Sequence, residues 1–136
     1  MKKKLPKISE AEWQVMKVVW DNPSASAAQI VEKLAARQKW SNRTIKTLLA
    51  RLVNKGALTY TAEANRYLYE PNIPKEELIK QESQSFINRV FDGGALPMLA
   101  HFVKHAHFSS DEIHELKQIL EEKTGGTGNG KSSRKR

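Results

Sequence analysis

The hydrophobic period of this chain changes abruptly at Gly56, and that change limits the folds it can adopt. From Ser41 to Lys55, large apolar residues recur at the three- and four-residue spacing of an amphipathic helix. From Leu58 to Ala62, apolar and polar residues alternate, as they do in a half-buried strand. Ser41 is a suitable N-cap, and Gly56 can take the positive φ at which helices often end. We therefore predict a helix that passes through a tight C-cap directly into a strand.

The apolar stripe of this predicted helix leaves an opposite face that is basic and has no acidic residue. The stripe consists of Ile45, Leu48, Leu49, Leu52 and Val53. The opposite face and its flanks carry Arg43, Thr44, Lys46, Thr47, Arg51 and Asn54. Such a face combines cations for phosphates with short polar groups that reach base edges. The alternative is an ordinary solvated helix face, and the neighbouring elements decide against it.

Two more helices and a second strand surround the basic helix. Ser9 begins a capping box for a first helix, and Pro23 follows its end. Ser26 caps a second helix, which fades near residues 37–39. Tyr67–Glu70 is a second strand, so the two strands form a hairpin with Arg66 near its tip. Three helices followed by a hairpin indicate a winged helix-turn-helix, with a generic small α+β domain as the alternative.

The second half of the chain predicts three short amphipathic helices, over about residues 75–91, 95–106 and 110–123. A segment of this length is too small to bury its large apolar residues alone, so we expect it to pair with a second copy. The alternative is that these helices pack back onto the winged helix of the same chain. The residues expected at the interface of the homodimer are Phe86, Val90, Phe102, Ile113, Leu116 and Leu120.

Charge divides the chain in the same way. The net charge is +8, but residues 1–72 carry 13 Lys and Arg against 6 Asp and Glu, whereas residues 73–123 carry 6 against 9. A basic first half suits a polyanion such as double-stranded DNA. We therefore predict a mainly α protein with a small β-hairpin. Residues 1–72 form the DNA-binding domain, residues 73–123 the three-helix dimerisation domain, and residues 124–136 a disordered basic tail.

Several classes of function and location are not expected. The chain has no cysteine, which excludes disulfides, cysteine zinc sites and thiol catalysis. It has no signal peptide and no apolar run of about 20 residues, so we expect a cytoplasmic protein. No arrangement of catalytic side chains stands out, and we expect no enzyme, no cofactor and no small-molecule substrate.

Two motifs are weaker than they look. Gly125–Ser132 matches a phosphate-binding loop, but that loop needs a strand before it and a helix after it, and the sequence offers neither. His101 and His105 have a spacing that can hold a metal, with His107 and His114 nearby. We interpret these histidines as ordinary polar positions at helix edges, and we expect no metal site.

Segments along nearly the whole chain resemble the penicillinase-repressor family of bacterial winged-helix regulators, which includes the methicillin-resistance repressors. The match runs from Ile8 to Lys123 and is specific because the motifs occur together. The segments that carry it are Ile8–Trp13, Val15–Met16, Trp40–Leu52, Lys55–Leu58, Tyr67–Tyr69, Pro71–Ile73, Ser85–Arg89 and Ile113–Leu120.

The resemblance implies a homodimeric transcriptional repressor of palindromic operators. In the β-lactam branch of the family, a membrane sensor-protease responds to the antibiotic, and the repressor is then cleaved in its dimerisation domain. The corresponding bond here is His101–Phe102, and this chain departs from the family pattern by having His101 where the family has Asn.

We assign roles on the DNA-binding surface from the chemistry of each side chain. Arg43, Lys46 and Thr47 are expected at or near base edges, and Thr44 and Arg51 at phosphates. Arg66 is expected to touch the backbone or minor groove from the hairpin. The alternative function is a winged-helix adaptor for RNA or protein, for which Trp40 and the hairpin tyrosines are the stacking candidates.

Overall fold

The computed structural model describes residues 5–125. The chain forms two compact units, and the boundary between them falls between Ser85 and Phe86. The first contains α1 (Glu10–Asp21), β1 (Ala25–Ser26), α2 (Ala27–Ala35), α3 (Asn42–Lys55), β2 (Leu58–Glu63), β3 (Arg66–Pro71) and the beginning of α4 (Lys75–Phe91). The second contains the rest of α4, α5 (Ala95–His105) and α6 (Ser110–Gly125). No helix within residues 5–125 is long and apolar enough to span a bilayer.

Local capping interactions set the helix ends of the first unit. The Ser9 hydroxyl accepts from the Glu12 N–H at 3.2 Å, and the Glu12 carboxylate accepts from the Ser9 N–H at 2.8 Å. Ser26 and Gln29 form the same reciprocal pair at the start of α2. Ser41 caps α3 by accepting from the Thr44 N–H at 3.1 Å. The three predicted N-caps are therefore confirmed.

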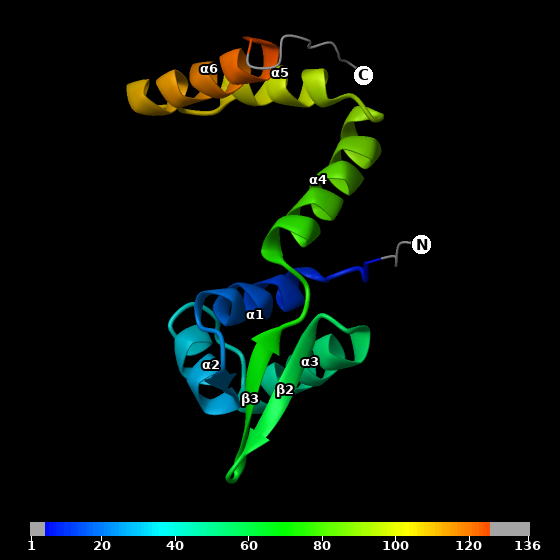
Figure 1. The fold of residues 1–136 in the computed structure, drawn as a ribbon, viewed down its shortest axis with the longest axis vertical. Coiled ribbons are helices and arrows are strands. Elements are labelled where there is room, and N and C mark those ends of the chain that lie inside the picture. Colours follow the sequence, from blue (N-terminus) through cyan, green and yellow to red (C-terminus); the bar gives the residue numbers. More distant parts are fainter. Residues whose placement is uncertain (1–4, 126–136) are drawn as a thin grey trace. The chain divides into compact units, whose positions relative to one another are not determined.

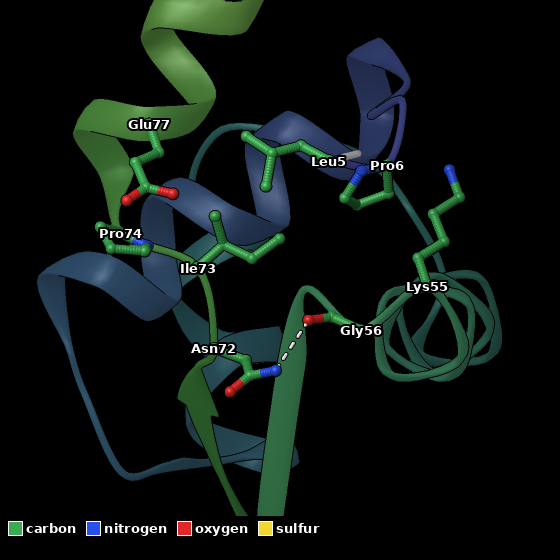
Figure 2. Close-up of a pocket in the computed structure, with 8 residues that line it drawn as sticks. All are labelled: Leu5, Pro6, Lys55, Gly56, Asn72, Ile73, Pro74 and Glu77. Atoms are coloured by element: carbon green, nitrogen blue, oxygen red, sulfur yellow. Dashed lines mark hydrogen bonds between the residues drawn. The ribbon is translucent and has the colours of Figure 1, made fainter. Parts of the chain in front are cut away.

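The C-terminus of α3 is the turn that the sequence predicts. Gly56 has φ 84°, a left-handed conformation that is costly for a residue with a Cβ. The Asn72 amide donates to the Gly56 carbonyl at 2.9 Å, so the segment after the hairpin is tied to the end of α3 (Figure 2). This contact fixes the direction in which the chain leaves the sheet.

The hairpin belongs to a three-stranded antiparallel sheet with the order β1-β3-β2. Ala25 pairs with Tyr69, and Tyr60 pairs with Tyr69 from the other side. β2 and β3 are the two predicted strands, whereas β1 was not predicted, because a strand of two residues has no hydrophobic period. The predicted fold, mainly helical with a small β-element, is confirmed with this addition.

The expected half-burial of the first hairpin strand is wrong beyond its first residue. Leu58 is buried, whereas Tyr60 and Ala62 are exposed. The hairpin extends beyond the helices of the first unit (Figure 1), and the residues of β2 after Leu58 are exposed. Tyr60 instead stacks on Tyr67, with 4.3 Å between ring centroids.

The core of the first unit lies between its helices and the base of the sheet. Ile73 and Leu78, which the sequence analysis placed in the dimerisation domain, are part of this core. The Trp20 indole donates to the Ile73 carbonyl at 3.1 Å, which anchors the segment before α4. The other large core side chains are Ile8, Val15, Met16, Val18, Val19, Ile30, Leu34, Ile45, Leu48, Leu49, Leu52 and Leu58.

The second unit has three helices and little interior. Neither α5 nor α6 contains a buried residue. The Phe91 ring lies 5.9 Å from that of Phe86 and 6.2 Å from that of His101, which links α4 to α5. Ser109 forms a capping pair with Glu112 at the start of α6, and the helix continues through Thr124 and Gly125 of the predicted tail. The remainder of the tail, with most of the loop-like motif, lies outside the described residues.

Candidate nucleic-acid interface

The exposed side of α3 carries the candidate base-reading residues. Ile45, Leu48, Leu49 and Leu52 are buried, which confirms the predicted stripe. Because this stripe faces the core, the opposite side chains point away from it. Arg43, Thr44, Lys46, Thr47 and Arg51 are all exposed.

The cations on this face have no acidic partner among the residues that the structure describes. Within residues 5–125, Arg43, Lys46 and Arg51 form no ion pair, whereas Lys55 at the end of the helix pairs with Glu12. The Ser41 hydroxyl donates to the Thr44 hydroxyl at 3.1 Å, so Thr44 is held at the first turn. The arrangement presents unneutralised positive charge on a rigid helix, as a phosphate-lined groove requires.

The Glu12–Lys55 pair fixes the far end of the same helix. The Glu12 carboxylate is buried and accepts from the Lys55 ammonium at 2.5 Å, and Lys55 also donates to the Lys7 carbonyl at 2.7 Å. Burial raises the pKa of Glu12, but the hydrogen bonds from Lys55 and Ser9, with the charge of Lys55, outweigh burial and lower the pKa overall. Glu12 therefore stays ionised and holds the end of α3 against α1.

The hairpin supplies one cation and a group of three tyrosines. Arg66 begins β3, directly after the two-residue tip Ala64–Asn65. In the strand register its backbone lies opposite that of Glu63 in β2. Tyr60 is 46% exposed and Tyr67 is 49% exposed. The Tyr60 ring also lies 6.0 Å from that of Tyr69. The tyrosines form a continuous aromatic surface on the hairpin.

The ionisation of Tyr69 is shifted by this setting. Burial, and then the proximity of the Tyr60 and Tyr67 hydroxyls, raise the pKa of Tyr69. Its phenol therefore remains protonated at neutral pH and can donate a hydrogen bond. No DNA-binding role was predicted for the hairpin tyrosines, because the alternation of apolar and polar residues does not reveal whether a strand face is covered.

Part of α3 and the hairpin share one hollow. It has a volume of about 470 Å³, and no acidic residue among residues 5–125 lines it. Lys46 from α3 and Arg66 from β3 both line it, whereas Arg43, Thr44, Thr47 and Arg51 do not. The remaining lining residues are Ser26, Ala27, Ala28, Asn65, Tyr67 and Tyr69.

A second hollow, of about 330 Å³, lies beside the segment that leads into α4. Figure 2 shows Leu5, Pro6, Ile73 and Pro74 around it, with the carboxylate of Glu77 at its edge. None of the candidate DNA-binding residues lines this hollow. Lys55 does, but its ammonium is engaged by Glu12, so no described residue offers this hollow a free cation for a phosphate.

The six candidate dimerisation residues lie on the helices of the second unit. Val90 is 51% exposed and Phe102 is 41% exposed, while Ile113 and Leu120 are also exposed. Phe86 and Leu116 are half-buried. The candidate cleavage bond, His101–Phe102, is part of α5 and is exposed on its surface.

The histidines of α5 form a pair but not a larger cluster. The rings of His101 and His105 lie 4.6 Å apart between centroids. Over residues 5–125, no group of three or more His, Cys, Asp or Glu side chains is placed to hold a metal ion.

Comparison with known proteins identifies the family. The penicillinase repressor family matches residues 8–122. The penicillinase repressor of Bacillus licheniformis is 42% identical over 120 residues, which cover 88% of this chain and 94% of that protein. The methicillin resistance regulatory protein MecI of Mammaliicoccus sciuri is 36% identical over 123 residues, which cover 90% of this chain and 100% of that protein.

Solved structures agree on the fold. The monomeric form of Bacillus licheniformis BlaI, in complex with the blaP half-operator, is 41% identical with a TM-score of 0.50, over 56% of this chain and 93% of that chain. The DNA-binding domain of the repressor BlaI gives a TM-score of 0.51 at the same identity and coverage. The family match, the sequence identities and the winged-helix fold lead to the same assignment. The chain belongs to the penicillinase repressor family of winged-helix proteins.

Proposed function

We propose that this protein is a DNA-binding transcriptional repressor that recognises specific operator sequences. The observation that carries the proposal is the exposed face of α3, on which Arg43, Lys46 and Arg51 form no ion pair within residues 5–125. Support comes from BlaI, whose structure was solved with the blaP half-operator at 41% identity. A helix of this kind fits the major groove, where base edges carry a distinct pattern of donors and acceptors.

Each side chain on this face has a proposed role. Arg43 and Thr47 point away from the core and contact base edges, while Thr44 and Arg51 hold phosphates on either side. Arg66 approaches the DNA from the hairpin. Lys46 belongs to α3, but it lines the same hollow as Arg66 of the hairpin. It can therefore reach DNA close to the groups that Arg66 contacts.

The protein acts as a homodimer on palindromic operators. Support comes from the large apolar side chains that α5 and α6 leave exposed, since two amphipathic helices that contain no buried residue need a partner surface. Two winged helices then meet half-sites spaced by about one DNA turn, roughly 34–36 Å, or by a multiple of it.

Repression is relieved when the dimer is lost. The proposed switch is cleavage of the His101–Phe102 bond by a membrane sensor-protease, and the regulated genes belong to β-lactam resistance or a related response. Both residues are exposed in α5, so a protease reaches the bond once that turn of helix unwinds. Cleavage there leaves α3 intact. It removes only the additional operator affinity that a dimer gains from its second winged helix.

The test is selection of duplexes from a random-sequence pool by the full-length protein. The proposal predicts a palindromic consensus, with far weaker binding to scrambled duplexes of the same length and charge. The same selection with genomic fragments from the source organism identifies the regulated genes. Failure to enrich any consensus, with equal binding to all duplexes, contradicts sequence-specific repression.

One observation favours the alternative of an RNA-binding adaptor. Tyr60 and Tyr67 are exposed and stacked, and exposed aromatic rings are the groups on which single-stranded bases stack. Parallel titrations with the selected duplex, the same duplex as RNA, and single-stranded RNA separate the two functions. Tighter binding to either RNA supports the adaptor, whereas preference for duplex DNA supports the repressor.

A further inference from the structure

We propose that the hollow between α3 and the hairpin holds one sugar–phosphate unit of the DNA backbone, clamped between Lys46 and Arg66 with Tyr67 as its aromatic wall. The inference rests on the proposed DNA-binding function and goes beyond it. It moves Lys46 from base reading to backbone binding, and it gives the hairpin tyrosines a role in that binding.

The charge of the hollow is the first support. Lys46 and Arg66 come from different elements, α3 and β3, yet they line the same space, and no acidic residue of the described part of the chain lines it with them. Neither side chain forms an ion pair within the described part of the chain. Two like charges on one hollow repel each other, and a bound anion removes that repulsion.

The walls of the hollow are the second support. Tyr67 and Tyr69 are two residues apart on β3, so they face the same side of the sheet. The Tyr67 ring is braced by its stack on Tyr60 and is about half exposed. A braced ring with an apolar face and a polar hydroxyl suits the deoxyribose next to a phosphate.

The part of the hollow that α2 lines has small side chains. It is formed at the start of α2 by Ala27 and Ala28, whose side chains are single methyl groups. The volume of about 470 Å³ exceeds what a bare phosphate needs and falls in the range of sites for small organic groups. The size therefore fits a phosphate together with its sugar.

The position of the hollow explains why Lys46 binds backbone rather than bases. A base-reading side chain must reach the floor of the major groove, whereas Lys46 lies where α3 meets the hairpin. Arg43 and Thr47 do not line the hollow and remain free to read base edges. A lysine ammonium is also a compact point charge on a flexible stem, so it can pair with a phosphate oxygen without a fixed bidentate geometry.

The test uses duplexes selected by the full-length protein, with single phosphates replaced by neutral methylphosphonates. The clamp predicts one phosphate in each half-site whose replacement lowers the affinity of the wild-type protein for the duplex about 10-fold. Lys46→Ala and Arg66→Ala should each lose most of that sensitivity, and at the same phosphate. Tyr67→Ala should weaken binding to every duplex about equally, whereas Tyr67→Phe, which keeps the ring, should lose much less.

Lys80→Ala is the matched control, because it removes an exposed cation from α4. It should leave the methylphosphonate pattern unchanged. The clamp is overturned if Lys46→Ala changes the preferred base at one position, or if Lys46 and Arg66 respond to different phosphates. A wild-type protein that selects no duplex defeats the DNA-binding function itself, so the two failures are distinguishable.

A final arm separates the DNA backbone from free anions. Inorganic phosphate and a deoxynucleoside monophosphate are titrated against the protein, with and without the selected duplex. The proposal predicts that neither displaces the duplex at millimolar concentration beyond the effect of ionic strength. Displacement that requires both Lys46 and Arg66, combined with a flat methylphosphonate scan, would assign the hollow to a free anion instead.

Discussion

At the scale of single residues, Glu12 joins two helices that are far apart in the sequence. One of its carboxylate oxygens accepts from the Ser9 N–H at the start of α1 and from the Lys55 ammonium at the end of α3. A buried carboxylate is tolerated only when its hydrogen bonds and charge are satisfied, and both are satisfied here. The orientation of the proposed recognition helix therefore depends on a carboxylate that lies outside the DNA-binding surface.

Replacing Glu12 with Gln should lower the free energy of unfolding by about 1–3 kcal/mol at neutral pH, since Lys55 loses its charged partner. The pKa of Glu12 is lowered in the folded protein, so its contribution is present above the pKa of about 4.5 for the unfolded chain and is lost as pH falls through the folded value. The difference between the two proteins should therefore shrink below about pH 4.5. Urea unfolding of both proteins across pH 3–7 measures it.

Glu10→Gln is the control, because Glu10 lies in the same first turn but is exposed. It should change stability by only a few tenths of a kcal/mol, since an exposed acid at a helix N-terminus contributes little. Equal effects of the two substitutions, or a Glu12→Gln effect that does not depend on pH, would contradict the role given to the buried pair.

At the scale of elements, local signals were enough to predict the helices and the hairpin. Ser9, Ser26, Ser41 and Gly56 act on neighbouring backbone groups, so their effects can be read without knowing the fold. The exposure of Tyr60 could not be predicted, because it depends on how far the helices reach along the sheet. The shared hollow of Lys46 and Arg66 could not be predicted either, since it forms only when distant segments of the chain meet.

The hairpin tip has a strained backbone, because a residue other than glycine occupies a position with positive φ. Ala64 has φ 56°, in the left-handed region where a Cβ is unfavourable. Ala64→Gly should therefore raise the free energy of unfolding by up to about 1 kcal/mol, because relief of the strain exceeds the added entropy of the unfolded chain. Thermal unfolding measures the change.

The same substitution in the neighbouring strand is the control. Ala62 lies in β2 and is paired with Tyr67, so Ala62→Gly removes a side chain without relieving a positive φ. It should be neutral or destabilising by about 0.5–1 kcal/mol. A stabilising Ala62→Gly together with a destabilising Ala64→Gly would show that the tip is not strained in solution.

At the scale of the whole molecule, the two parts of the chain differ in charge and in burial. Residues 1–72 are basic and contribute most of the core side chains. Residues 73–123 carry more acidic than basic side chains, and their helices α5 and α6 contain no buried residue. This contrast fits a division between DNA binding and assembly. The core position of Leu78 also indicates that a DNA-binding fragment should extend past Asn72 into α4.

Leu120→Glu should weaken dimerisation, because it places a charge on an apolar surface that we propose is buried between two copies. Sedimentation should show a shift from dimer to monomer. Affinity for a full palindrome should fall by about 100-fold or more, since the second winged helix no longer binds at high effective concentration. Affinity for an isolated half-site should stay the same.

Gln118→Glu is the control in the same helix, as it adds the same charge at an exposed polar position. It should leave both the dimer and the affinity for the palindrome unchanged. A Leu120→Glu protein that remains dimeric, or that binds the palindrome as tightly as the wild type, would contradict the proposed interface.

The most direct measurement is the binding of the double variant Arg43→Ala, Thr47→Ala to the selected duplex and to its single-base variants. If the exposed face of α3 reads sequence, affinity for the selected duplex should fall by about 1–3 kcal/mol for each lost base contact, and discrimination should relax at the contacted positions. Lys80→Ala should retain the wild-type pattern. A double variant with unchanged affinity and unchanged base preference would contradict the claim that this helix recognises DNA.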